Sequence, residues 1–188
     1  MILQLKIKIN GISKPPVWRK VLVPADFTFE KLHLVIQYAF GWGGGHLYAF
    51  TPGGLGTNPS IERVSGDKVY DSENVDMDSE KTKISKFLKA KGDMFAYTYD
   101  FGDDWEHIIT VEATTTDKAT HATLIGGKGK CPPDDCGGVW GYQDFIKAVN
   151  TPSHPDHEDM REWIGLSKGQ SWDPNDFNPE DRAWLVKE

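Results

Sequence analysis

Residues 97–107 constrain the fold more than any other part of the chain. Aromatic and polar residues alternate there, pass through a polar turn that contains Gly102, and alternate again. Two alternating runs around such a turn are typical of a β-hairpin. We therefore predict strands at residues 94–99 and 105–113, joined by a tight turn.

The first forty residues predict a strand–strand–helix unit. Apolar and polar residues alternate over residues 1–10, which is the pattern of a half-buried strand, and residues 17–23 form a second strand after a loop. Apolar residues then recur at helical spacing over residues 29–40, with Thr28 suited to the N-cap and Gly41 to the position after the helix. We expect this helix to pack its apolar face on the sheet.

The remaining segments predict shorter elements. We expect a strand at 46–51, a long loop over 52–80 with one short strand near 68–70, and short helices at 84–88, 142–149, 155–163 and after residue 179. At 188 residues the chain suits one well-buried core. The prediction is a single α+β domain over residues 1–188, with an antiparallel or mixed sheet and short C-terminal helices.

Charge and hydropathy narrow the possible partners and location. The formal net charge is −7, although residues 1–60 carry six Lys or Arg against two Asp or Glu. An acidic chain makes strong non-specific nucleic-acid binding unlikely. No apolar run approaches the roughly 20 residues that cross a bilayer, and the alternating N-terminus does not resemble a signal peptide. We expect a cytoplasmic protein without membrane association.

The hairpin turn concentrates groups that could hold a metal ion. Asp100, Asp103, Asp104 and His107 supply carboxylate and imidazole ligands that suit Mn, Zn or Fe. In the structural alternative, the aspartates bind backbone amides of the turn and His107 packs within the sheet. A kinase function is not indicated, because Asp100-Phe101-Gly102 lacks the accompanying kinase motifs.

Two cysteines four residues apart offer another kind of site. Cys131 and Cys136 could bind a structural zinc ion together with His154 and His157. They could instead be ordinary buried thiols in a rigid Pro-Pro loop, or form a local disulfide. A cysteine nucleophile would need a histidine such as His46 or His107 beside it in space.

Several motifs in their order along the chain resemble one known family. The motifs are Pro15-Pro16-Val17-Trp18-Arg19, Phe40-Gly41-Trp42 with His46-Leu47, Tyr99 to His107, Cys131-Pro132-Pro133-Asp134-Asp135-Cys136 with the following Gly137 to Tyr142, and Pro152-Ser153-His154-Pro155. Together they resemble the plasmid pRi ORF-three-like family, whose members are often labelled transposon TnpR-like or insertion-element passenger proteins.

The resemblance implies a single α+β domain without an established biochemical activity. It also implies a set of binding residues, which are His46, Asp100, Asp103, Asp104, Trp105, His107, Asp135 and Tyr142. Tyr48 stands where family members often carry a histidine or another polar residue. This difference argues against a His-x-His metal site that begins at His46. The resolvase label is not supported, because the acidic chain lacks an arginine cluster and a basic helix-turn-helix.

We therefore expect a non-enzymatic binding or accessory module that binds an unidentified protein or nucleic acid, and a mobile-element context would be compatible with either partner. Its face would be built from the hairpin turn and the Cys131 loop. One alternative is a metal-dependent hydrolase or nuclease that holds a divalent cation in a His/Asp cluster. The other is a structural zinc protein. The candidate metal ligands are His107, Asp103, Asp104, Cys131 and Cys136.

Overall fold

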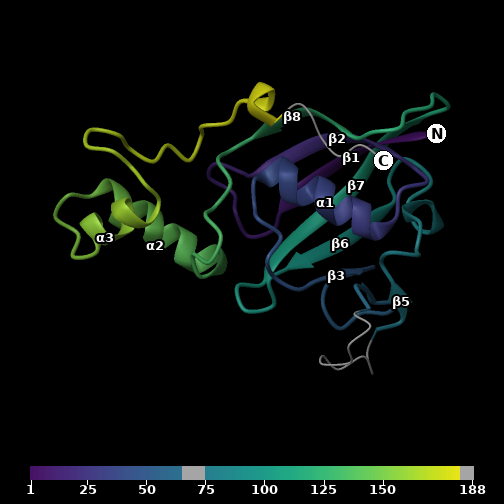
Figure 1. Ribbon diagram of the computed structural model, residues 1–188, viewed down its shortest axis with the longest axis horizontal. Helices are drawn as coiled ribbons and strands as arrows, with labels where there is room; N and C mark the ends of the chain where they lie inside the picture. The colour runs from purple at the N-terminus through teal and green to yellow at the C-terminus, as the bar shows by residue number, and fades with distance from the viewer. Residues whose placement is uncertain (65–74, 183–188) are drawn as a thin grey trace.

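The core of the molecule is an eight-stranded mixed sheet, seen in a computed structural model that describes residues 1–64 and 75–182 (Figure 1). Its strands are β1 (Ile2–Ile9), β2 (Trp18–Pro24), β3 (Tyr48–Thr51), β4 (Ile61–Glu62), β5 (Met77–Asp78), β6 (Met94–Tyr99), β7 (Trp105–Thr115) and β8 (Thr123–Lys128). Their spatial order is β5-β4-β3-β6-β7-β1-β2-β8. All neighbours are antiparallel except the short β4–β5 pair.

The predicted N-terminal strands and central hairpin are confirmed, and they form the middle of the sheet. β1 pairs with β2 on one side and with β7 on the other. Alternate residues of β1 are fully buried, as its period of two predicts, while Lys8 on the opposite face is exposed. β6 pairs with β7, with Tyr99 opposite Trp105 next to the turn.

Helix α1 (Phe29–Phe40) lies across one face of this sheet, as predicted (Figure 1). The Thr28 side chain accepts a hydrogen bond from the amide of Lys31 at 3.2 Å and so caps the first turn. Gly41 ends the helix in the left-handed region, with φ of 92°, and its amide donates to the Gln37 carbonyl. The apolar stripe of α1 is buried against the sheet, which completes a two-layer α+β fold.

The C-terminal third forms a smaller helical layer beside the sheet. Helices α2 (Gly138–Asn150) and α3 (His157–Trp163) lie to one side of it in Figure 1. His157 ties them together, because its Nδ1 lies 2.9 Å from the carbonyl oxygen of Ala148. Two 3₁₀ turns, η2 (Ile84–Lys86) and η3 (Pro179–Arg182), complete the described elements. No helix in residues 1–64 or 75–182 is both long and apolar enough to cross a membrane.

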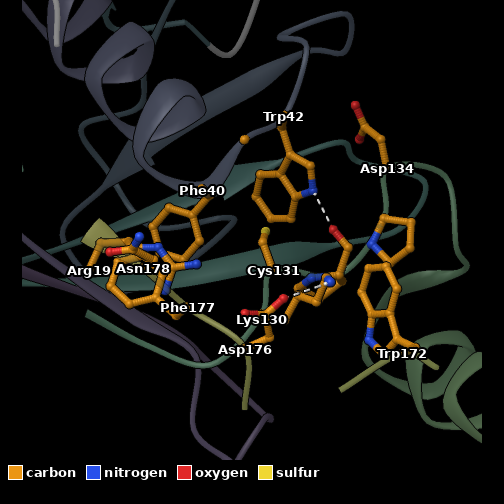
Figure 2. Close-up of a pocket in the computed structure, with 13 residues that line it drawn as sticks. Arg19, Phe40, Trp42, Lys130, Cys131, Asp134, Trp172, Asp176, Phe177 and Asn178 are labelled. Atoms are coloured by element: carbon orange, nitrogen blue, oxygen red, sulfur yellow. Dashed lines mark hydrogen bonds and ion pairs between the residues drawn. The ribbon is translucent and has the colours of Figure 1, made fainter. Parts of the chain in front are cut away.

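Residues 172–178, here called the C-terminal strap, return from α3 to the edge of the sheet. The Phe177 ring lies 3.9 Å from the buried guanidinium of Arg19, whose other face meets Phe40 (Figure 2). Lys130 Nζ lies 3.0 Å from a carboxylate oxygen of Asp176 and 4.5 Å from the ring of Trp172. The strap therefore joins the helical layer to β2 and β8.

The structure differs from the sequence prediction in several segments. The strand expected from residue 46 begins at Tyr48, and the strand predicted near 68–70 lies outside the described residues. The short helix expected at 84–88 is the 3₁₀ turn η2, and α2 begins four residues before the predicted start. β8 was not predicted, because Gly126 and Gly127 lower its strand propensity. A Cβ at Gly127 would lie 2.6 Å from the Phe177 ring, so the strap requires a glycine there.

Candidate functional site

The turn between β6 and β7 is fixed by its own aspartates. The amide of Asp104 donates to the Asp100 carbonyl at 2.7 Å, and both aspartates adopt positive φ. Oδ1 of Asp100 accepts from the amides of Gly102 at 2.9 Å and Asp103 at 3.4 Å. These bonds form an Asx-type turn, in which the side chain replaces a backbone acceptor. They leave Oδ2 of Asp100 available to another part of the chain.

The loop that contains the two cysteines packs directly against this turn. The Gly137 amide donates to Oδ2 of Asp103 at 3.0 Å. A Cβ on Gly138 would lie only 2.3 Å from the carbonyl oxygen of Asp103, so the two backbones are in close contact there. Earlier in the loop, the Pro132 carbonyl accepts a hydrogen bond from Nε1 of Trp42 at 3.0 Å (Figure 2). Two segments separated by more than twenty residues in sequence thus form one surface.

His46 connects the turn to this loop. Its Nε2 lies 3.1 Å from Oδ1 of Asp135, and its Nδ1 lies 3.7 Å from Oδ2 of Asp100. Within residues 1–64 and 75–182, these three side chains form the one group of three or more potential metal ligands, with ligand atoms within 4.8 Å of one another. The imidazole lies between two carboxylates, which is an arrangement that holds the three segments together.

Another acidic side chain, Asp134, lies deeper in the same surface. The Tyr99 hydroxyl donates to Oδ2 of Asp134 at 3.3 Å, whereas the buried Oδ1 has no hydrogen-bond partner among the described residues. Burial raises the pKa of the Asp134 carboxyl above its ordinary value and is also the main cause that raises the pKa of Tyr99 to about 12. The surface is therefore acidic, and its innermost carboxylate is poorly compensated.

Comparison with known proteins assigns the chain to a family. The sequence profile described as plasmid pRiA4b ORF-3-like protein matches residues 1–181. The chain belongs to the plasmid pRiA4b ORF-3-like family. Uncharacterized protein y4hQ of Sinorhizobium fredii (strain NBRC 101917 / NGR234) is 36% identical over 167 residues, which are 88% of this chain and 82% of the relative. The crystal structure of a protein of unknown function, MM3350 from Methanosarcina mazei Go1, matches with a TM-score of 0.75 and 31% identity, covering 97% of this chain and 98% of that one.

In this pRiA4b ORF-3-like protein, His107 does not join the carboxylates of the turn. It is fully buried in β7, and its Nδ1 lies 2.9 Å from the Trp105 carbonyl and 3.3 Å from that of Tyr97. Burial lowers the pKa of His107 to about 4, so the imidazole is neutral at pH 7. Asp103 and Asp104 are likewise used in the turn. His107 therefore packs within the sheet and the aspartates bind the backbone, as in the alternative to a metal site. The structure does not bring His107 together with Asp103 and Asp104.

Cys131, Cys136 and Tyr142 were also candidate site residues, and their contacts in the structure are as follows. No disulfide joins Cys131 to Cys136, and neither belongs to a group of three potential ligands within the described chain. Burial raises the pKa of Cys136 to about 12, which keeps that thiol protonated and opposes a nucleophilic role. The Tyr142 hydroxyl lies 3.4 Å from the Lys130 carbonyl and 3.3 Å from Nε1 of Trp172. His157, a further candidate zinc ligand, is bound to α2 as described above.

One buried polar cluster of this protein was not predicted from the sequence. His33 and Gln37 lie on the buried side of α1, where their side chains meet the hydroxyl of Tyr97. Their signal was a polar pair four residues apart on an otherwise apolar helix face. This cluster lies beside the glycine loop at residues 43–45 and is separate from the acidic surface.

Proposed function

We propose that this pRiA4b ORF-3-like protein is a non-enzymatic binding module that recognises a cationic segment of a protein partner. The recognition surface would be the acidic-aromatic face, which comprises residues 100–104 and 134–140. The observation that carries the proposal is the joining of these two segments through the contact between Asp103 and Gly137. A preformed surface of this kind needs little ordering when a partner binds.

Two exposed aromatic side chains belong to this face. Trp140 is 80% exposed at the start of α2, and Phe101 is 41% exposed in the turn. Tryptophan is enriched among residues that dominate binding energy at protein interfaces. Figure 1 shows the β6–β7 turn beside the start of α2, so both side chains belong to neighbouring segments. We propose that they provide the apolar part of the contact.

The charge of the face selects the class of partner. Its carboxylates are Asp100, Asp103, Asp104, Asp134 and Asp135, and neither segment contains a lysine or an arginine. Electrostatic complementarity therefore favours arginine- or lysine-rich protein segments and disfavours the phosphate backbone of nucleic acids. An accessory role in a mobile element would be consistent with the plasmid origin in the family's description.

Fluorescence anisotropy with a labelled arginine-rich peptide at low salt tests this proposal. We expect saturable binding that weakens with added salt, and no binding of a glutamate-rich peptide of equal length. Trp140→Ala should lower the affinity about tenfold or more, since such interface residues contribute more than about 1.4 kcal/mol. Met94→Ala is the control, because Met94 is 57% exposed at the opposite end of β6. Binding that Trp140→Ala leaves unchanged would refute the assignment.

A second candidate function follows from the group of three potential metal ligands that includes His46. We propose as the alternative that this protein is a metal-dependent hydrolase or nuclease, in which His46, Asp100 and Asp135 bind a divalent cation. Imidazole and carboxylate groups are suitable ligands for Zn and Mn. Titration of the purified protein with Zn²⁺ or Mn²⁺, followed by calorimetry, tests this. About one equivalent bound by the wild type and none by His46→Ala would favour it over the binding module. Absence of binding would eliminate the metal site.

A further inference from the structure

A cavity of about 690 Å³ lies between α1 and the start of β3, bordered by the glycine loop at residues 43–45. Its volume is within the range of small-molecule sites in proteins. Aromatic and polar side chains share its wall, among them Tyr38, Trp42 and Tyr48. Its lining includes none of residues 100–104 and 134–140, although His46, which lines it, also lies beside Asp100 and Asp135. The inference drawn from the cavity does not rest on the proposed function.

A hydrogen-bonded cluster forms the base of this cavity. Gln37 Nε2 lies 2.8 Å from the Tyr97 hydroxyl oxygen, and Nδ1 of His33 lies 2.8 Å from the same oxygen. His33 and Gln37 are 4% and 3% exposed, and both line the cavity. Burial lowers the pKa of His33 to about 4, so its ring is neutral at pH 7 and carries one N–H.

The protons of this cluster can be arranged in two ways. In the first, Gln37 Nε2 donates to Tyr97, the Tyr97 hydroxyl donates to Nδ1 of His33, and Nε2 of His33 carries the proton. In the second, the Gln37 amide is turned over and accepts from Tyr97, while His33 donates through Nδ1 and its Nε2 becomes an acceptor. Each arrangement leaves at least one donor and one acceptor unused, with a donor on one of the two residues and the acceptor on the other.

Nε2 of His33 and Oε1 of Gln37 both lie close to Gly44. A Cβ built on Gly44 would lie 3.7 Å from Nε2 of His33 and 3.9 Å from Oε1 of Gln37. Oε1 is buried and has no hydrogen-bond partner among the described residues. A buried carbonyl oxygen without a hydrogen bond is unfavourable, so a ligand that supplies the missing donor gains affinity.

We propose that the cavity binds a small, neutral, planar heterocycle through an edge that presents a hydrogen-bond donor beside an acceptor, as in a pyrimidine base. The donor of the ligand would pair with the acceptor of the His33–Gln37 pair, and its acceptor with the donor. The absence of a side chain at Gly44 permits this edge to approach. No atom lies within 4 Å of the Cβ positions of Gly43 and Gly45, which leaves space for a flat ring.

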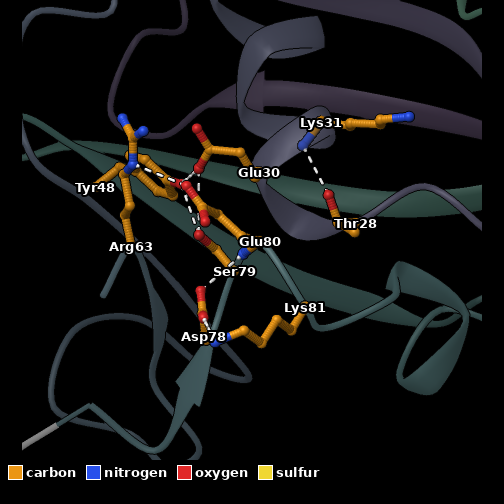
Figure 3. A network of polar contacts seen from close by, with 9 residues as sticks. All are labelled: Thr28, Glu30, Lys31, Tyr48, Arg63, Asp78, Ser79, Glu80 and Lys81. Carbon is orange, nitrogen blue, oxygen red and sulfur yellow. Dashed lines mark hydrogen bonds and ion pairs between the residues drawn. The ribbon is translucent and has the colours of Figure 1, made fainter. Parts of the chain in front are cut away.

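The surrounding side chains support a planar and uncharged ligand. Tyr48 stacks on His33 with ring centroids 3.9 Å apart, so the cavity already accommodates aromatic stacking. Glu30 and Glu62 face one cation, Arg63, whose Nε lies 3.2 Å from a carboxylate oxygen of Glu80 (Figure 3). Glu30 in turn accepts from the Tyr48 hydroxyl (Figure 3). Such a wall disfavours a phosphate, which points to a base or nucleoside rather than a nucleotide.

Protein-observed NMR with uridine and 3-methyluridine tests the proposal. Uridine should shift the side-chain signals of His33 and Gln37 in a saturable manner. In 3-methyluridine a methyl group replaces the hydrogen of the donor N–H on that edge. We expect its affinity to be lower than that of uridine by a factor of about ten or more. Equal affinities, or shifts confined to other residues, would overturn the proposal, as would the absence of any shift.

Cytidine tests the exchange of roles between His33 and Gln37. Its amino group and ring nitrogen also place a donor beside an acceptor, in the opposite order from uridine, so we expect it to bind with an affinity similar to that of uridine. If uridine bound and cytidine did not, recognition through a donor beside an acceptor would be refuted, because both bases present such an edge.

Gln37→Leu provides a test within the protein. This variant removes the hydrogen bond from Gln37 and should bind uridine about tenfold more weakly than the wild type. Lys31→Gln, on the same helix but outside the cavity lining, should bind uridine as the wild type does. A thermal melt establishes that each variant folds. If Gln37→Leu does not fold, the comparison of the two nucleosides on the wild-type protein still decides the outcome.

Discussion

His33 and His107 are the two buried imidazoles whose protonation is most strongly opposed by the fold. Burial lowers the pKa of each to about 4 from the ordinary value of 6.5. His107 is fully enclosed, with Phe40 and Trp42 in edge-on contact with its ring. A charged imidazole there would lose its hydration without gaining a carboxylate partner, which is why the neutral form is favoured.

We expect the free energy of unfolding to fall as the pH decreases from 6.5 to about 4. In this window the unfolded chain binds protons at these histidines and the folded chain does not, so protonation favours unfolding. Each histidine contributes up to about 3 kcal/mol to this loss. Urea unfolding of the wild type at pH 7 and pH 4.5 measures the difference. His107→Gln should reduce it, while His121→Gln, at an exposed position, is the control. A wild-type stability that did not change with pH would contradict this account.

The close contact between the β6–β7 turn and the start of α2 depends on how these two elements pack. Gly137 and Gly138 both adopt positive φ at the start of α2, and Gly141 follows one turn later. Three glycines in the first turn oppose helix formation by propensity alone. The helix begins there because only glycines allow its backbone to contact Asp103 and Cys136 so closely.

Gly138→Ala should destabilise the protein by about 3 kcal/mol or more. The added Cβ would lie 2.3 Å from the Asp103 carbonyl oxygen, so the turn and the helix would have to separate. Gly165→Ala is a matched control, because its φ is also 67° but no atom lies within 4 Å of its Cβ position. It should cost only the conformational strain of about 1–2 kcal/mol. Urea unfolding of both variants tests this, and equal losses would show that the close contact is unimportant.

At the scale of the whole molecule, the C-terminal strap holds the helical layer against the sheet. Asn150 bonds with both the amide and the carbonyl of Trp172, and Phe177 covers Arg19 at the sheet edge. The Arg19 guanidinium binds the carbonyl oxygens of Ala39, at the end of α1, and of Lys128 in β8. One buried cation thus connects helix, sheet edge and strap.

Phe177→Ala should lower the free energy of unfolding by about 2 kcal/mol. The change removes a half-buried ring and its cation–π contact with Arg19. Ile125→Ala, on β8 at a position that is 43% exposed, should cost less than about 0.5 kcal/mol. Chemical denaturation measures both. Similar losses for the two variants would mean that the strap contributes little to stability.

The sequence alone determined the parts of the fold that depend on local patterns. Alternation over residues 1–10 and 94–113 predicted the central strands, and Thr28 and Gly41 marked the ends of α1, because burial on one face requires a matching period. Family membership could also be recognised from motifs and is confirmed by the match over residues 1–181.

The tertiary structure alone decided where the chemical groups meet. Sequence adjacency suggested that His107 belongs with Asp103 and Asp104, but the strand period directs it into the core. His46 instead lies between Asp100 and Asp135, which come from segments far apart in the chain. β8 and the start of α2 depend on glycines whose local preference opposes regular structure, and close backbone contacts override that preference. Contacts between distant segments depend on the complete packing of the chain, which no local sequence pattern specifies.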